Sequence, residues 1–199
     1  MASASLTRLP LDPTTGYLPL GRHRTTEADI KARFLDDDQF KASQTRQEAW
    51  GDYELGRDLL RSKLRIHAVW FGGSFLTAKV DAKDVDALFI VSASDYRKLD
   101  AKGKQVVESF NPAPGPLGAL IRGHGLGRLD SYLLMWAPWS PFQPGPQAPD
   151  QLQYAGSRGY WDDFWPRDRF HKPNGVPAHW KDALPVRGYL EVMLDAYDR

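Results

Sequence analysis

One stretch decides the fold: Phe71-Gly72-Gly73-Ser74-Phe75-Leu76-Thr77, followed ten residues after Ser74 by Asp84-Val85-Asp86. The apolar run before the glycines, from Ile66 to Phe71, is typical of a short buried strand. A second apolar run, Val85 to Val91, begins at the acidic pair. The sequence therefore predicts two strands joined through a glycine turn.

The acidic pair has a spacing that matters chemically. In an extended strand residues i and i+2 face the same way, so Asp84 and Asp86 present two carboxylates on one side. Two like charges there repel unless a cation lies between them, and Mg²⁺ prefers a few carboxylate oxygens together with substrate phosphates. The pair is thus a candidate metal site for Mg²⁺ or Mn²⁺. The alternative is a solvated turn at a strand entrance.

The glycine turn supplies a candidate phosphate site. Gly72 and Gly73 permit left-handed backbone angles and close approach of a ligand. We expect a helix to start at about Phe75, so that its free N–H groups and those of Ser74 would face a phosphate chain.

A third acid, Asp130, lies near the start of a third predicted strand, Leu129 to Trp136. If that strand pairs beside the second, the interstrand spacing of about 4.8 Å brings the three carboxylates together. Three acids and a phosphate site indicate two-metal phosphoryl chemistry. An unrelated surface position is the alternative for Asp130.

Helices are predicted on either side of this core. Thr26 and Asp29 mark a helix start with Ile30 and Phe34 as its apolar face, and a longer helix is expected from about Thr45 to Lys63. Its buried face should comprise Trp50, Tyr53, Leu59 and Leu60, with Arg46 among the solvated charges. A further helix over 94–110, interrupted at Gly103, is expected between the second and third strands.

We predict a single α/β (α+β) domain over residues 1–199, with a small mixed sheet and packed helices. An extended lead-in and helices occupy 1–64, the core 65–136, and a loop-rich aromatic extension 137–199.

Composition excludes several classes of protein. The 199 residues carry a net charge of +1, which removes bulk electrostatics as a reason to bind nucleic acid. The absence of cysteine excludes disulfides, a thiol nucleophile and Cys-ligated metal, and fits the cytoplasm. No stretch approaches the roughly 20 apolar residues of a membrane span, and no export signal is expected.

Other candidate motifs are weaker. Gly123 to Arg128 fails as a dinucleotide fingerprint, because its third glycine would fall on Arg128. The five histidines have no zinc-ligand spacing, and His67 is expected to be structural. The run Asp36–Asp38 is expected to be a solvated helix end. Arginines with possible phosphate contacts are Arg46, Arg122, Arg128, Arg167, Arg169 and Arg187.

The aromatic stretch from Tyr160 to Lys172 mixes rings with cations. Such a mixture can stack bases of a single-stranded nucleic acid. We favour a folded lid whose aromatic rings complete the core, because Asp162, Asp163 and Asp168 dilute the positive charge.

The chain resembles proteins of the nucleotidyltransferase fold, the polymerase-beta-like superfamily. Their signature is an apolar residue followed by Gly-Gly-Ser, a spacer, and then Asp-apolar-Asp, as in Phe71–Ser74 and Asp84–Asp86 here. More closely, Trp70–Phe89, Leu18–His23 and Tyr160–Gly188 resemble small, largely uncharacterised nucleotidyltransferase-like proteins of bacteria and their phages. The chain departs from them in its tail, where Pro173–Pro185 is expanded.

The resemblance implies that Gly72, Gly73 and Ser74 hold the phosphates of an NTP such as ATP, and that Asp84, Asp86 and Asp130 bind the catalytic metals. It implies transfer of a nucleoside monophosphate to an acceptor hydroxyl on RNA, a protein or a small molecule. It also implies a toxin–antitoxin or phage-defence setting, with a partner protein encoded nearby. The rival hypothesis is a non-catalytic nucleotide- or partner-binding protein with the same fold.

Overall fold

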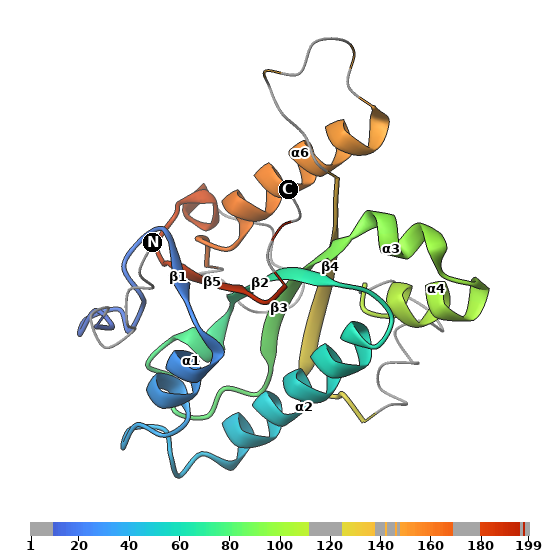
Figure 1. Ribbon diagram of the computed structural model, residues 1–199. Coiled ribbons are helices and arrows are strands. Elements are labelled where there is room, and N and C mark those ends of the chain that lie inside the picture. Colours follow the sequence, from blue (N-terminus) through green and yellow to red (C-terminus); the bar gives the residue numbers. More distant parts are fainter. Residues whose placement is uncertain are drawn as a thin grey trace.

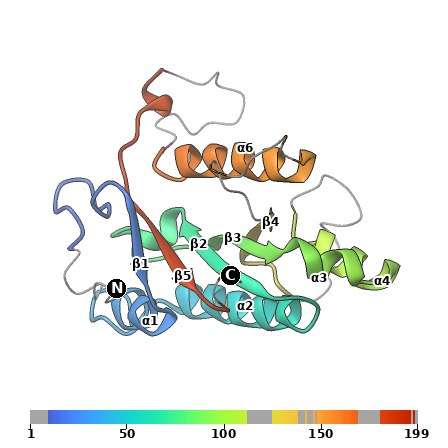
Figure 2. The same ribbon diagram turned by 45° about the horizontal axis from the view of Figure 1, so that its top comes forward.

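The computed structural model describes residues 10–111, 125–137, 142, 146, 148–168, 180–195 and 197. Its elements form three layers, with a twisted sheet between one long helix on one side and two helices on the other (Figures 1 and 2). The predicted α+β class with a small mixed sheet is confirmed.

The sheet has five strands in the order β1-β5-β2-β3-β4. Their bounds are β1 (Arg22–Thr25), β2 (Ile66–Gly72), β3 (Val85–Ser92), β4 (Leu129–Trp136) and β5 (Tyr189–Met193). Strands β2 and β3 are antiparallel, whereas β3 and β4 are parallel. Strand β5 pairs antiparallel with β2 and parallel with β1. The three strands predicted from the apolar runs are confirmed, and β1 and β5 are additions.

Helices α1 (Glu27–Phe34) and α2 (Gln44–Arg61) cover one face of the sheet. Each has a side-chain cap at its first turn, because the hydroxyl of Thr26 accepts from the Asp29 backbone N–H and that of Ser43 from the Arg46 backbone N–H. The cap predicted at Thr26 and both helices are confirmed; in α2, Trp50, Tyr53 and Leu60 are buried as predicted, whereas Leu59 is only partly buried.

Two short helices, α3 (Ala93–Lys98) and α4 (Ala101–Glu108), replace the single interrupted helix expected over 94–110. The break falls at Leu99–Asp100 rather than at Gly103. It falls there because the side chain of Asp100 accepts a hydrogen bond from the Gly103 backbone N–H at 2.7 Å, which caps a new helix.

The opposite face is covered by α6 (Pro149–Phe164), which lies across the sheet (Figures 1 and 2). The sequence analysis placed this segment in a loop-rich extension. Proline at the first helical position is compatible with a helix, so the proline-rich composition misled the prediction. A short 3-10 helix, η3 (Trp180–Ala183), precedes β5. None of the described helices is long and apolar enough to cross a bilayer.

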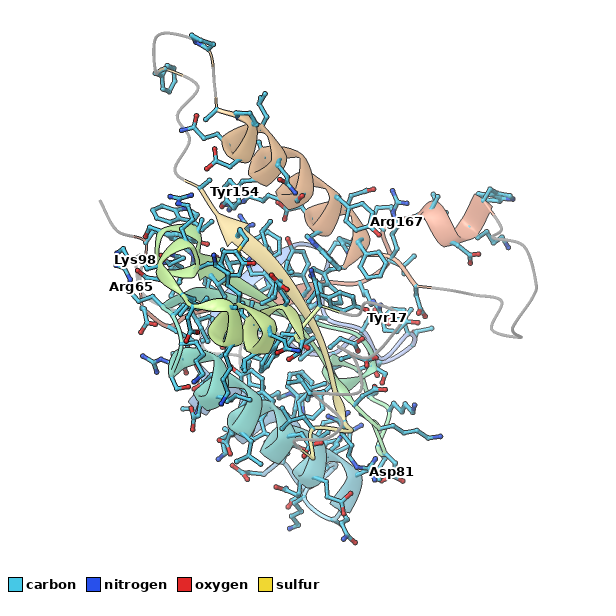
Figure 3. All side chains as sticks on the ribbon, turned by 90° about the vertical axis from the view of Figure 1, so that its right-hand side faces the viewer. Tyr17, Arg65, Asp81, Lys98, Tyr154 and Arg167 are labelled. Atoms are coloured by element: carbon cyan, nitrogen blue, oxygen red, sulfur yellow. The ribbon has the colours of Figure 1, made fainter. Side chains whose placement is uncertain are left out.

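Two clusters of buried residues lie on the two faces. The α2 side holds the larger cluster, where Trp50 and Tyr53 pack against Phe71, Phe75 and Phe89. The α6 side holds a smaller one, with members Ala68, Trp70, Leu88, Ile90, Leu134, Ala137, Tyr154, Trp165 and Tyr189. Figure 3 shows this layering from the side, with Tyr154 on α6 and Asp81 at the far end of the molecule.

Candidate functional site

The first part of the candidate site is the acidic pair at the start of β3. Asp84 immediately precedes the strand, and Asp86 is its second residue. Leu88 and Ile90, which alternate with Asp86 on the same side of the strand, belong to the cluster under α6. Asp86 therefore faces α6, not α2.

The third acid lies directly beside this pair. Strands β3 and β4 are parallel, and their register sets Asp86 opposite Asp130. Neighbouring strands are about 4.8 Å apart, so both carboxylates start from adjacent points at one end of the sheet. The structure thus places Asp130 on the same side of the sheet as Asp86.

The carboxylates also interact electrostatically. Asp130 is exposed, yet its pKa is raised, first by partial desolvation and then by the negative charge of Asp84. A cation would relieve this repulsion.

Each glycine of the turn is fixed by a close neighbour. Gly73 has φ +68°, which is left-handed, and a Cβ there would lie 1.6 Å from Oδ2 of Asp86. Gly72 pairs with Asp86 across β2 and β3, and a Cβ on it would lie 2.2 Å from Cε3 of Trp165. The turn therefore holds the Asp86 carboxylate against the backbone beneath the Trp165 ring.

The helix expected to start at about Phe75 does not form. Only a three-residue 3-10 turn, η2 (Ser74–Leu76), follows Gly73. So short a turn has almost no aligned peptide dipoles, and the prediction of dipole-assisted phosphate binding at Ser74 is wrong. What remains accessible is the backbone of Gly73 and Ser74, which are partly exposed, whereas Gly72 is buried against Trp165.

The loop between the turn and the acidic pair is held by Arg46. Its guanidinium donates hydrogen bonds to the backbone carbonyls of Phe34, Phe75, Thr77, Lys79 and Val80, at 2.6 to 3.3 Å. The side chain is fully buried, and burial lowers its pKa to about 10. The predictions that Arg46 is solvated or binds phosphate are wrong, because its donors are committed to the chain itself.

Aromatic rings cover the acids from the α6 side. Tyr132 follows Asp130 on the same face of β4, and its ring centroid lies 4.6 Å from that of Trp161. Burial raises the pKa of Tyr132 to about 12, and the nearby charges of Asp86, Asp130 and Asp84 add to the shift. The folded-lid prediction is confirmed for Trp165, which is buried, but Tyr160 and Phe164 are exposed.

The donor set suits a hard divalent cation. Carboxylate oxygens are the ligands that Mg²⁺ uses, and Mg²⁺ keeps several waters rather than requiring an all-protein cage. Among the side chains that the structure describes, no three His, Asp or Glu residues form a ready-made metal cage. Asp84, Asp86 and Asp130 fit an open site of the kind that Mg²⁺ shares with substrate phosphates.

The other candidate arginines within the described residues have structural roles. Arg128 pairs with Glu48 and donates to the carbonyl of Lys83. Arg167 pairs with Asp163 on α6. Arg187 lies 3.7 Å from Asp168 and donates to the carbonyl of Trp165. These arginines therefore tie segments of the chain to one another.

Two further motifs from the sequence also have structural roles. His67 is buried with its ring against Trp136, as a structural histidine should be. In the run after α1, Asp37 pairs with Arg33 and Asp38 pairs with Lys41. Local ion pairs thus hold the expected helix end.

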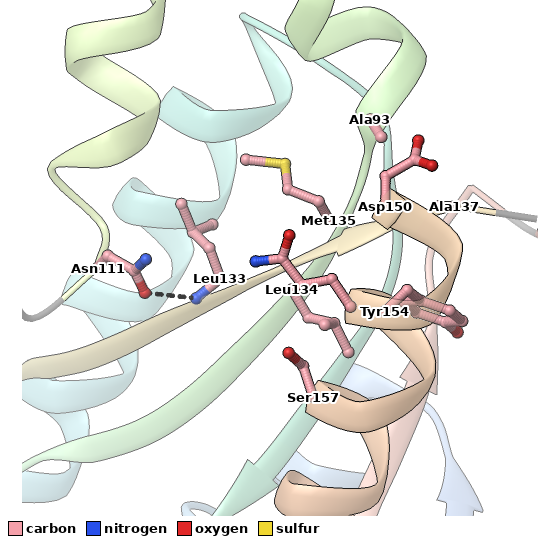
Figure 4. Close-up of a pocket in the computed structure, with 10 residues that line it drawn as sticks. Ala93, Asn111, Leu133, Leu134, Met135, Ala137, Asp150, Tyr154 and Ser157 are labelled. Atoms are coloured by element: carbon pink, nitrogen blue, oxygen red, sulfur yellow. Dashed lines mark hydrogen bonds between the residues drawn. The ribbon is translucent and has the colours of Figure 1, made fainter. Parts of the chain in front are cut away.

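Arg122 and Arg169 lie outside the described residues, as do His124, His171 and His179. A cavity of about 180 Å³ is present elsewhere, between β4 and the first half of α6, with Leu134, Met135, Tyr154 and Ser157 in its lining (Figure 4). The lining residue nearest to Asp130 along β4 is Leu133, three residues or roughly 10 Å away, and neither Asp84, Asp86 nor Asp130 lines the cavity. It is therefore separate from the acids.

Residues 9–179 match a family described as a family of unknown function, DUF6932. The chain belongs to this family. No curated protein and no solved structure matches it.

Proposed function

We propose that this DUF6932 protein is a metal-dependent nucleotidyltransferase, which transfers a nucleoside monophosphate from an NTP to an acceptor hydroxyl. One observation supports this most. Asp86 and Asp130 are register partners on parallel strands, and the Asp86 carboxylate lies against Gly73 of the turn. Acids next to a turn whose Gly73 and Ser74 are partly exposed suit a metal-bound triphosphate.

In the proposed reaction the acceptor oxygen forms a bond to the α-phosphorus. The bond between the α-phosphorus and the bridging oxygen to the β-phosphate breaks, and pyrophosphate leaves with the electron pair. Mg²⁺ or Mn²⁺, when bound, would neutralise the developing charge and position the triphosphate. Asp84 and Asp86 would hold the cation, and the Gly72–Ser74 backbone would lie along the phosphates.

Asp130 is the proposed acceptor of the hydroxyl proton. Its register position opposite Asp86 places it beside the proposed metal site, and its exposure leaves it accessible to an acceptor. The acceptor hydroxyl belongs to RNA, a protein or a small molecule, and we place the reaction in the cytoplasm, in a toxin–antitoxin or phage-defence setting.

The test is label transfer. The protein is incubated with each α-³²P-labelled NTP, Mg²⁺ or Mn²⁺ and cell extract, and the label is located on RNA, protein and small molecules. Asp86→Asn keeps size and shape but removes a metal-binding charge, so we expect a loss of at least about 100-fold in transfer. Asp38→Asn, an exposed change on the turn after α1, is the matched control and should transfer normally.

The second candidate is a non-catalytic nucleotide- or partner-binding protein. It is favoured by the lack of a ready-made metal cage among the described side chains and by the Trp165 ring over Gly72. Undiminished transfer by Asp86→Asn would overturn the proposed mechanism. A parent protein with no transfer from any NTP, but with a cellular effect that Asp86→Asn preserves, would support this second candidate.

A further inference from the structure

Two exposed rings stack on each other near the end of α6. Tyr160 is 60% exposed and Phe164 is 41% exposed. They are four residues apart on the helix, and their rings are nearly parallel, with an interplanar angle of 21° and centroids 5.8 Å apart. We call this pair the ring ledge.

The ring ledge is held from behind. Trp161 contacts both of its members edge to face, with centroids 5.3 Å from Tyr160 and 5.3 Å from Phe164. Phe164 also packs edge to face on Trp165, which is buried. Ring contacts with Trp161, and for Phe164 also with Trp165, therefore support the ledge from the side of the sheet.

The ring ledge is connected to the three acids through two aromatic residues, Tyr132 and Trp161. Tyr132, on the strand that carries Asp130, contacts Trp161, which in turn contacts both ledge rings. The hydroxyl of Tyr132 is within electrostatic range of Asp84, Asp86, Asp130 and the Tyr160 hydroxyl. One aromatic residue therefore separates the carboxylates from the ledge support.

The charges around the ring ledge and its small area limit the kind of ligand that it can bind. Asp162 and Asp163 lie between the two rings in sequence and pair with Arg22 and Arg167, so these cations beside the ledge are balanced by carboxylates rather than available to the phosphates of a nucleic-acid strand. Two rings are far smaller than the roughly 800 Å² per partner of a stable protein interface. A single flat, uncharged group suits the ledge, and stacking is the contact that an aromatic surface offers such a group.

We infer that the ring ledge of Tyr160 and Phe164 binds the nucleobase of the NTP by stacking, with a preference for purines over pyrimidines. This inference rests on the proposed function, since it assumes that the triphosphate lies at Asp84, Asp86 and Asp130. Purines are preferred because their larger π-face stacks more strongly on the free face of an aromatic ring than a pyrimidine does.

The experiment compares ligands with and without a base. Binding of ATP, CTP and inorganic tripolyphosphate is measured by calorimetry with Mg²⁺, for the parent chain and for Tyr160→Ala/Phe164→Ala. Stacking contributes about 1–3 kcal/mol per base, so the double variant should bind ATP about 5- to 150-fold more weakly. Its affinity for tripolyphosphate should stay within about 2-fold.

A matched control is Leu152→Ala, which removes another exposed apolar side chain from the same helix, two turns before the ring ledge. It should leave ATP affinity unchanged. A circular dichroism spectrum of each variant checks that α6 remains folded, and Tyr160→Leu/Phe164→Leu keeps apolar volume without stacking if the alanine variant unfolds.

The two proposals fail in different ways. If ATP and tripolyphosphate bind the parent only with Mg²⁺ but the ledge variants bind ATP normally, the ring ledge is not the base site and the proposed function stands. Equal affinity of the parent for ATP and CTP would overturn the purine preference. If tripolyphosphate and NTPs do not bind at all, both proposals are wrong.

Discussion

The two faces of the sheet are built from different chemistry. Against α2 the strands present Val69, Phe71, Val85, Ala87 and Phe89, all at most 1% exposed and all apolar. Against α6 the same strands present Asp86, Asp130, Tyr132 and Trp70, and β5 adds the buried Glu191. The first face is a packed core, whereas the second combines packing with charge.

The charges under α6 are organised rather than scattered. The carboxylate of Glu191 accepts from Trp70 Nε1 at 2.9 Å and from Arg24 Nε at 2.9 Å. Arg22 lies over the Trp70 ring and pairs with Asp162 of α6, which also accepts from the hydroxyl of Tyr189. The comparison shows a division of labour between the two faces. The apolar α2 face supplies most of the packing, and the α6 face can therefore carry the acids Asp86 and Asp130 at one end of the sheet.

The largest effect on stability should come from Arg46, the one fully buried charged group on the α2 side of the described chain. Arg46→Met leaves five backbone carbonyls without the donor that joins them. We expect the free energy of unfolding to fall by about 3–5 kcal/mol, measured by urea denaturation.

Arg97→Met is the control for this change, since Arg97 is exposed on α3 and should cost under about 0.5 kcal/mol. If Arg46→Met does not fold, Arg46→Lys keeps the charge but loses donors and should be intermediate. A loss below about 1 kcal/mol for Arg46→Met would show that the α2 face does not depend on this residue.

An intermediate effect is expected where α6 meets the glycine turn. Gly72→Ala places a Cβ 2.2 Å from a Trp165 ring that is 1% exposed and cannot swing aside. Overpacking of this kind costs about 1–3 kcal/mol. In a Trp165→Leu background the same change should cost less, so urea denaturation of the four proteins should give a coupling of about 1 kcal/mol or more.

The matched change on the other face is Gly51→Ala in α2, where a Cβ meets nothing within 4 Å. It should stabilise the protein by about 0.5–1 kcal/mol, because alanine favours the helix. If the losses in unfolding free energy for Gly72→Ala and Trp165→Leu were additive, the Trp165 ring would not pack against Gly72, contrary to the structure.

The smallest effect should come from Asp130. Its pKa is raised in the folded state, so the ionised carboxylate opposes folding at neutral pH, and Asp130→Asn should stabilise the metal-free protein. Solvent screening at this exposed position limits the gain to under about 1 kcal/mol. The gain should vanish below about pH 3, where the carboxyl is protonated in both folded and unfolded chains. Urea denaturation at about pH 7.5 and about pH 3 checks this, and a destabilised variant at the higher pH would contradict it.

The α2 face could be predicted from the sequence because it rests on periodicity. Continuous apolar runs marked β2 and β3, helical apolar spacing marked α1 and α2, and a threonine cap marked the start of α1. The structural role of Arg46 could not be predicted, because a charged residue at its position in a helix is normally on the solvent-exposed side. That role depends on carbonyls 12 to 34 residues away, which no local pattern contains.

The α6 face was harder to predict because its elements meet only in three dimensions. Strands β1 and β5 are short and carry Arg24 and Glu191, which pair with each other across the sheet. The acidic spacing indicated Asp84 and Asp86, and the adjacency of Asp130 followed only once β4 was paired with β3. The sequence shows that Tyr160 and Phe164 are aromatic, but aromatic residues in a helix are equally compatible with rings buried in the core, so their exposure could not be predicted.

The position of β1 at the outer edge of the sheet has a consequence for how the chain is made. Strand β1 pairs with β5, and Arg24 and Glu191 are 167 residues apart. While the ribosome is still translating the stretch before β5, β1 has no sheet neighbour and the β2 edge is uncovered. Nascent chains of this protein should therefore need protection from aggregation until residues 189–193 emerge, and the closing of the sheet should be a late event in biosynthesis.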